Sequence, residues 1–241
     1  NWARIVAQVV YYFTSAVALG APVRTVDFTV PTGNFGDIFA GYVAKKMGLP
    51  VRWLRIASNV NDILPRTLKT GIYEVREVHA SASPSMDIQI SSNFERLLFE
   101  ASGRDAAGVR RLMESLKQSG RFVLPDATLA AIREEFDAGR ADETETAAAI
   151  RAAWREAGDL VDPHTAVGYA VARQQRHSTS PIVTLATAHP AKFPDAVEKA
   201  SGVRPGLPKR LEHLMSAEER FTVLPNDVGQ VREFVLSRQS A

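Results

Sequence analysis

The 241-residue sequence contains no cysteine. Disulfide bonds, thiolate zinc sites and cysteine nucleophiles are therefore excluded. The absence is compatible with a reducing compartment, and we predict a cytoplasmic protein. The histidines show no paired metal-binding spacing, and Asp162 and His164 lack an evident third ligand, so we predict no metal site. A G-x-S-x-G motif is also missing, which leaves serine hydrolysis without support.

A concentrated basic patch and a long apolar run are also missing. The 29 Lys and Arg residues nearly balance the 27 Asp and Glu residues, and both signs are interspersed along the chain. A nucleic-acid-binding protein usually gathers its positive charge on one face, so we predict no nucleic-acid partner. The first 20 residues carry apolar side chains at helical spacing, but Arg4 and Gln8 make this helix too polar to span a membrane. We therefore predict no membrane partner.

What the sequence does contain is a strand, turn, helix and strand in succession near its beginning. Residues 24–30 alternate between apolar and polar side chains, residues 37–47 have helical spacing, and residues 51–57 have the pattern of a second strand. Two strands joined by one helix predict a parallel, right-handed crossover unit. The predicted fold class is therefore α/β, with an open, mostly parallel sheet and flanking helices.

The rest of the chain divides into a core and two additions. We assign residues 1–80 and 160–205 to the core of a single domain. Four amphipathic segments predict a helical insertion at 81–159, and charged helical sequence predicts a tail at 206–241. Because the helical pattern begins at Asn1 itself, the chain is expected to be a piece of a longer protein.

Local signals place the later helices. Asp126 and Asp142 are expected to cap the third and fourth helices of the insertion. Asp162 is expected to cap a further helix, with Pro163 in its first position. The sheet should resume in the short apolar run at 181–187.

The turn after the first strand has two glycines. Gly33 and Gly36 flank Asn34 and Phe35 where the helix begins. A helix amino terminus carries unpaired N–H groups and the positive end of the helix dipole, so the turn could cradle a phosphate. It could equally be a plain strand-to-helix connection. It is not a nucleotide-binding loop, because Asp37 stands where that motif needs lysine. Asp37 is expected to turn away and accept hydrogen bonds from backbone N–H groups.

Six sequence blocks resemble one enzyme family. They occur in the order "NWARI", "VPTGNFGDIFAGYVAKKMGLP", "NVNDIL", "SPSMDIQISSNFERLLFE", "DPHTAVG" and "TAHPAKF". As a set they resemble threonine synthase of the bacterial and fungal type, a pyridoxal-phosphate enzyme of the tryptophan-synthase-β-like fold group. The resemblance implies fold type II and covers nearly the whole chain.

The resemblance also implies where the cofactor binds. The loop that receives the 5′-phosphate of pyridoxal 5'-phosphate would comprise Gly33, Asn34, Phe35, Gly36 and Asp37. Thr187, which follows the late strand, would face the pyridine nitrogen, where a hydroxyl leaves the nitrogen less basic than a carboxylate would. Alternatively, the Thr187 hydroxyl could cap the next helix.

The implied reaction converts O-phospho-L-homoserine and water to L-threonine and phosphate, with O-phosphohomoserine as the small-molecule substrate. The leaving phosphate needs hydrogen-bond donors, and Asn59, Asn61, Asn93 and Arg96 are the candidates. The asparagines could instead be turn formers, and Arg96 could be a solvated helix residue.

The family's Schiff-base lysine is missing from this chain. None of the lysines has the family's lysine context, and Lys192 lies on the helix after the late strand. The lysine is expected upstream of Asn1, so no catalytic residue is assigned here. We interpret the chain as the carboxyl-terminal half of a threonine synthase, a lyase, with the amino-terminal half as its partner, and predict that it is inactive alone. The alternatives are a non-catalytic module that binds a phosphorylated ligand, and a related phospho-lyase acting on another phosphorylated amino alcohol.

Overall fold

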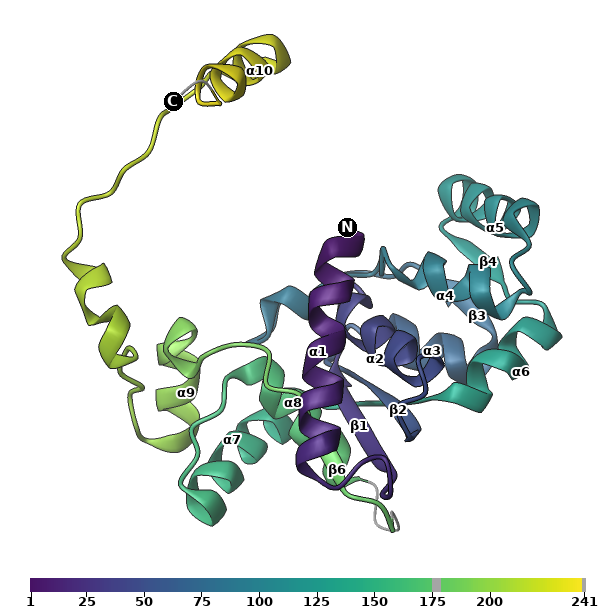
Figure 1. Cartoon of the computed structure of the whole chain (residues 1–241), viewed down its shortest axis with the longest axis horizontal. Helices are drawn as coiled ribbons and strands as arrows, with labels where there is room; N and C mark the ends of the chain where they lie inside the picture. Colours follow the sequence, from purple (N-terminus) through teal and green to yellow (C-terminus); the bar gives the residue numbers. More distant parts are fainter. Residues whose placement is uncertain (175–178, 240–241) are drawn as a thin grey trace. The chain divides into compact units, whose positions relative to one another are not determined.

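The computed structural model describes residues 1–174 and 179–239. The chain forms two compact units, Asn1–Pro205 and Gly206–Ala241. Within the described residues of the first unit, four parallel strands form the main sheet in the order β5-β2-β1-β6 (Figure 1). Their bounds are β1 Val26–Pro31, β2 Val51–Ser58, β5 Phe136–Arg140 and β6 Ile182–Thr184. The predicted α/β fold with a parallel sheet is confirmed.

Helices cover both faces of this sheet. On one face, Tyr12 of α1 contacts Phe28 of β1, and α1 packs against α2. On the other, Gly168 of α8 lies against Pro31, three residues further along β1. Because side chains alternate along a strand, an odd separation puts Phe28 and Pro31 on opposite faces. Before the insertion the helices are α1 Trp2–Ala18, α2 Gly36–Lys46 and α3 Ile63–Thr70; α8 Pro163–Arg173 and α9 Pro194–Ser201 come after it.

Residues 81–159, predicted as a helical insertion, also contain strands. The helices are α4 Phe94–Ala101, α5 Ala106–Ser119, α6 Asp126–Glu135 and α7 Glu143–Ala157, preceded by the short 3-10 helix η1, Pro84–Met86. The third amphipathic segment of the insertion, residues 126–139, is helical only in its first part: its last four residues, "FDAG", belong to β5, which pairs with β2 in the main sheet. Strand β4, Arg121–Val123, pairs antiparallel with β3, Ile72–Glu74. Burial of Phe136 in the core overrides the weak helical pattern.

The predicted helix caps are correct at two of three positions. Asp142 caps α7 in a capping box with Glu145, and Asp162 caps α8. Asp126 is not a cap, because α6 begins one residue earlier than expected: Pro125 occupies the cap position and Asp126 the first turn. A carboxylate in the first turn still interacts favourably with the helix dipole.

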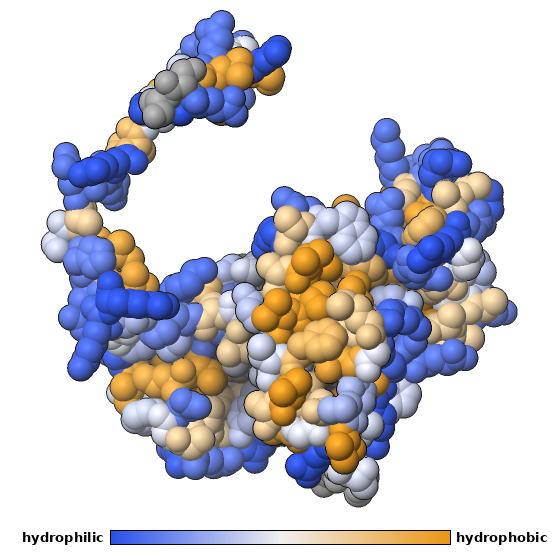
Figure 2. All heavy atoms as spheres, viewed as in Figure 1, coloured by the Kyte–Doolittle hydropathy of each residue, from blue (hydrophilic) through white to orange (hydrophobic). Residues whose placement is uncertain are grey.

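Helix α1 has apolar residues both on a buried face and on an exposed face. Ile5, Val9, Tyr12 and Ala16 are buried in the core, whereas Trp2, Val6, Val10 and Val17 are more than half exposed. Figure 2 shows an apolar area over α1. Within the described residues, no helix is both long and apolar enough to cross a membrane. The second unit, described by itself, holds the 3-10 helix η3, Lys209–Met215, and α10, Val228–Ser237.

Candidate functional site

The glycine turn sits at the carboxyl end of β1, and its backbone is unusual. Phe35 adopts φ 65°, a left-handed conformation that non-glycine residues rarely occupy, immediately before α2 begins. Its ring is buried against Phe94 and Phe136, with centroids 5.3 and 5.6 Å apart. Such backbone strain costs of order 1–3 kcal/mol and persists only where packing enforces it. The aromatic packing therefore fixes the shape of the turn.

Residues after β3 brace the outer side of the turn. The Ser91 hydroxyl donates to the Gly33 carbonyl at 2.6 Å, and the Asn93 backbone N–H and side-chain amide both donate to the Asn34 carbonyl, at 3.0 and 2.9 Å. A Cβ on Gly33 would lie 2.6 Å from the Ser85 carbonyl oxygen of η1. Only glycine fits there without movement of the backbone.

The inner side of the turn carries free donors. Among the described residues, no hydrogen bond occupies the backbone N–H groups of 33–38. These groups belong to a helix amino terminus and line a cavity of about 820 Å³. They are available to an anion.

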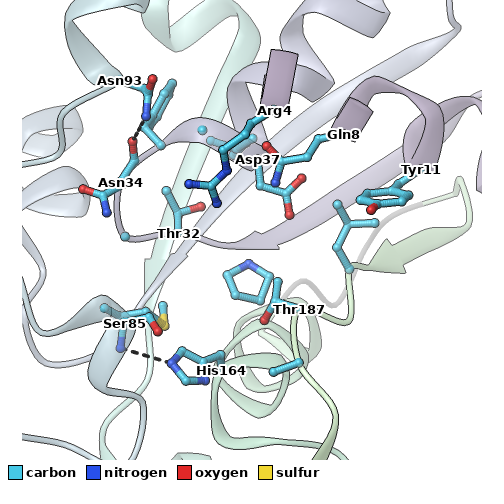
Figure 3. A pocket seen from close by; sticks show the side chains of 18 of the residues that line it. Arg4, Gln8, Tyr11, Thr32, Asn34, Asp37, Ser85, Asn93, His164 and Thr187 are labelled. Carbon is cyan, nitrogen blue, oxygen red and sulfur yellow. Dashed lines mark hydrogen bonds between the residues drawn. The ribbon is translucent and has the colours of Figure 1, made fainter. Parts of the chain in front are cut away.

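Two further elements complete the cavity (Figure 3). Thr187, three residues beyond the end of β6, and His164, from the first turn of α8, line it opposite the turn. His164 Nδ1 is 2.8 Å from Asp162 Oδ1, and His164 Nε2 accepts the Ser85 backbone N–H at 3.2 Å. Lys192, in the 3-10 helix η2, Pro190–Lys192, also lines the cavity.

Helix α1 contributes a polar face that the sequence analysis did not assign to the site. Asn1, Arg4, Gln8 and Tyr11, at steps of three and four residues, line the cavity, and Figure 3 shows Arg4 and Gln8 near Asp37. Among the described residues, Arg4 makes no ion pair or side-chain hydrogen bond. The signal was present as polar residues recurring within an apolar helix, but only the tertiary fold shows which space they face.

Asp37 does not behave as predicted. It lines the cavity, and its Oδ1 is shielded from solvent without a hydrogen-bond partner among the described residues. Burial raises the pKa of Asp37 to about 6, partly offset by the Tyr12 hydroxyl. That hydroxyl donates to the Asp37 backbone carbonyl at 2.9 Å. The expected bonds from backbone N–H groups are absent among the described residues.

The four proposed phosphate donors separate into two groups. The side-chain amide of Asn59 donates to Ser81, Ser83 and Asp87 within a buried network, and the Asn61 amide donates to the His79 carbonyl and to Asp87. Neither asparagine lines the cavity.

Asn93 and Arg96 lie nearer to the cavity than Asn59 and Asn61. Asn93 lines the cavity, and Arg96 lies in a neighbouring hollow, with its Nε 3.1 Å from Asn93 Oδ1 and its guanidinium 4.8 Å from the Trp2 ring centroid. A role for any of the four in binding phosphate stays a prediction. Within the described residues, no group of three or more His, Asp or Glu side chains is arranged to hold a metal ion.

Solved structures resemble this fold. A crystal structure of pyridoxal-phosphate-bound threonine synthase from Brucella melitensis is 62% identical with a TM-score of 0.93, covering 100% of this chain and 52% of that one. Yeast threonine synthase is 37% identical with a TM-score of 0.87, covering 100% of this chain and 53% of that one. The four-stranded parallel sheet with flanking helices matches the fold type II pyridoxal-phosphate enzymes.

Within the fold type II enzymes, similar proteins of known sequence include threonine synthases. Threonine synthase from Pseudomonas aeruginosa is 52% identical over 98% of this chain and 50% of its own length, and the Saccharomyces cerevisiae enzyme is 41% identical over 98% and 51%. A family model described as threonine synthase, C-terminal, matches residues 165–235. The chain is a threonine synthase homologue that spans about half the length of the curated relatives it matches.

Proposed function

We propose that this chain forms the cofactor-phosphate and leaving-phosphate side of a threonine synthase site, which converts O-phospho-L-homoserine and water to L-threonine and phosphate. The observation that carries the proposal is the row of backbone N–H groups at 33–38, in a cavity that also contains Arg4; neither the N–H groups nor Arg4 has a partner among the described residues. The similarity to relatives named threonine synthase, one of them solved with pyridoxal phosphate, supports this assignment.

The residues present fit pyridoxal phosphate. The N–H groups of the turn would hold its 5′-phosphate at the positive end of the α2 dipole, and Thr187 would offer a hydroxyl to the ring nitrogen. Asp37 limits the fit, because its ionised form would repel the phosphate; the raised pKa keeps part of this carboxyl neutral near pH 6. When bound, the cofactor would supply an electron sink for negative charge on the substrate carbons.

Arg4 would bind the phosphate that leaves the substrate. Its guanidinium is a permanent cation on the α1 wall, with no carboxylate within ion-pair distance among the described residues. An arginine can bind phosphate through two parallel hydrogen bonds and stabilise the dianion as it departs. Arg4 suits this role better than Asn59 or Asn61, whose amide hydrogens are already donated elsewhere.

The proposal requires a lysine that this chain does not supply. Lys192 lines the cavity, but the family resemblance places the reactive lysine elsewhere. The relatives are about twice as long as this chain, so their other half would provide it and would cover the apolar face of α1. We propose that this half is the chain's partner and that the chain alone is inactive.

Borohydride trapping tests this proposal. The polypeptide that contains this chain is purified from its source, incubated with pyridoxal phosphate, reduced and mapped by mass spectrometry. We expect a pyridoxyl-lysine outside residues 1–241, and a Lys192→Arg variant should keep it. An adduct on Lys192 would contradict the assignment. Phosphate binding without any adduct would instead favour a non-catalytic module, and turnover of a different phosphorylated amino alcohol would indicate a related phospho-lyase.

A further inference from the structure

Asp162 is a fully buried carboxylate on which four donors converge. One oxygen accepts the His164 backbone N–H at 2.9 Å and the His164 Nδ1–H at 2.8 Å. The other accepts the Thr165 backbone N–H at 3.3 Å and the Thr165 hydroxyl. Burial raises the pKa of Asp162, but the hydrogen bonds from His164 and Thr165 outweigh burial and leave this pKa below its usual range. The group therefore stays ionised, with all its partners in the donor role.

The first path from Asp162 leads to Thr187. The Thr165 hydroxyl gives its only proton to Asp162, so its lone pairs remain free to accept. One of them accepts the Thr187 backbone N–H at 3.2 Å. This bond holds the segment after β6 against the start of α8, at the residue proposed to face the cofactor ring.

The second path leads to the glycine turn. A backbone N–H can only donate, so the bond from Ser85 requires His164 Nε2 to be unprotonated. The ring proton must then sit on Nδ1, where it is donated to Asp162. Ser85 is the residue whose carbonyl oxygen lies against Gly33. The tautomer of His164 therefore fixes η1 against the turn.

We propose that Asp162 is a positioning residue that sets the His164 tautomer and the Thr165 hydroxyl orientation, and through them fixes two opposite walls of the site. One wall is Ser85 with Gly33, and the other is Thr187. The inference rests on the proposed function only for its cofactor measurement.

An asparagine at this position tests the idea because it has the same shape but one fewer acceptor. If its NH₂ group faces His164, the ring must move its proton to Nε2, which then opposes the Ser85 N–H donor. If the NH₂ group faces Thr165, the hydroxyl must turn its proton away, toward the Thr187 N–H. In either orientation two donors face each other, and either the Ser85 bond to His164 or the Thr187 bond to Thr165 is lost. The analogous Asp→Asn change in serine proteases acts through the wrong histidine tautomer.

The experiment uses Asp162→Asn in the native polypeptide, with Asp142→Asn as the matched control, since Asp142 also caps a helix but is hydrogen-bonded to Glu145, which does not line the cavity. Selective ¹⁵N labelling of histidine reports the His164 tautomer, and hydrogen exchange reports the Thr187 amide. We expect Asp162→Asn to switch the tautomer or to expose the Thr187 amide, and to weaken pyridoxal phosphate binding by about tenfold, the scale of one misplaced polar contact. The Asp142 variant should change none of the three. An Asp162→Asn protein with both reporters unchanged would overturn the proposal.

Two variants of Thr165 keep the inference testable if Asp162→Asn does not fold. Thr165→Val should speed Thr187 amide exchange and weaken cofactor binding, and Thr165→Ser, which restores the hydroxyl, should restore both. Unaltered Thr187 exchange in Thr165→Val would refute the first path. Failure of the wild type to bind pyridoxal phosphate would refute the proposed function instead, while the tautomer and exchange measurements would still decide the role of Asp162.

Discussion

Two polar loops leave the same edge of the parallel sheet, one after β1 and one after β2, and the difference between them is instructive. In the loop after β2, Asn59 has all its polar side-chain atoms engaged, and it is 1% exposed. In the loop after β1, the backbone N–H groups of 33–38 have no partner among the described residues, and these residues line a cavity. Buried polar groups normally find partners within the protein. We therefore expect the loop with free donors to be the one that binds a ligand, and the satisfied loop to support the fold.

The largest effect should come from filling the close contact at the turn. Gly33→Ala puts a Cβ 2.6 Å from the Ser85 carbonyl oxygen, so either η1 or the turn must move. We expect affinity for pyridoxal phosphate to fall by about 100-fold or more, given a cost of about 3 kcal/mol for overpacking. Gly206→Ala is the control, because its Cβ meets no atom within 4 Å. Titration of the cofactor absorbance measures both, and equal affinities would show that the turn does not hold the ligand.

The satisfied loop should respond in stability and not in binding. Asn59→Ala removes an amide group whose two hydrogens are shared among three acceptors, and an oxygen that accepts two hydrogen bonds, in a buried network. We therefore expect a loss of about 3 kcal/mol in the free energy of unfolding. The exposed Asn226 provides an alanine control that should stay within about 0.5 kcal/mol. Urea denaturation measures stability, and phosphate titration of the folded protein measures binding. Weaker phosphate binding by folded Asn59→Ala would instead support Asn59 as a substrate ligand.

Asp37 should make stability depend on pH. Its folded pKa of about 6 lies above its ordinary value of 3.8, so the native state binds more protons than the unfolded state between these values. Stability should therefore fall as pH rises from about 4 to about 6, by up to about 3 kcal/mol without ligand. Asp37→Asn should remove this fall, while Asp159→Asn, at an exposed position, should keep it. Melting temperatures measured from pH 4 to 8 test whether Asp37 causes this pH dependence. Parallel curves for wild type and Asp37→Asn would show that it does not.

The smallest effects should separate two arginines. Arg4→Gln is expected to weaken phosphate binding about tenfold and to change stability by less than about 0.5 kcal/mol, because Arg4 has no ion-pair partner in the part of the chain that the structure describes. Arg96→Gln should do the reverse, with stability lower by about 1 kcal/mol, because Arg96 contacts Asn93 and the Trp2 ring. Calorimetric phosphate titration and melting curves distinguish them. A greater loss of phosphate binding in Arg96→Gln than in Arg4→Gln would instead support Arg96 as a ligand of the substrate phosphate.

The sequence predicts the local parts of this structure well. Strand β1, helix α2 and the caps at Asp142 and Asp162 follow from alternation, helical spacing and side-chain capping chemistry, all of which act within a few residues. Strand β5 could not be predicted in this way, because its state depends on a distant partner, β2.

The residues of the candidate site also differ in whether local sequence could predict them. Gly33 and Thr187 were predicted from a turn motif and a family resemblance, and the fold brings both to one cavity. Arg4 was not predicted, since a helix periodicity cannot show which of three faces meets a cavity. The engagement of Asn59 and Asn61 was also beyond prediction, because their partners lie 18 to 28 residues along the chain.

The left-handed Phe35 has a consequence for how substitutions across the molecule should be interpreted. Its ring is held by Phe94 of α4 and Phe136 of β5, and neither of these lines the cavity. Tyr73 in turn stacks on Phe94, and Tyr42 on Phe136. A map of mutational sensitivity drawn around the cavity should therefore extend along two aromatic chains into the core, where a change of ring size would be felt as a change in ligand affinity.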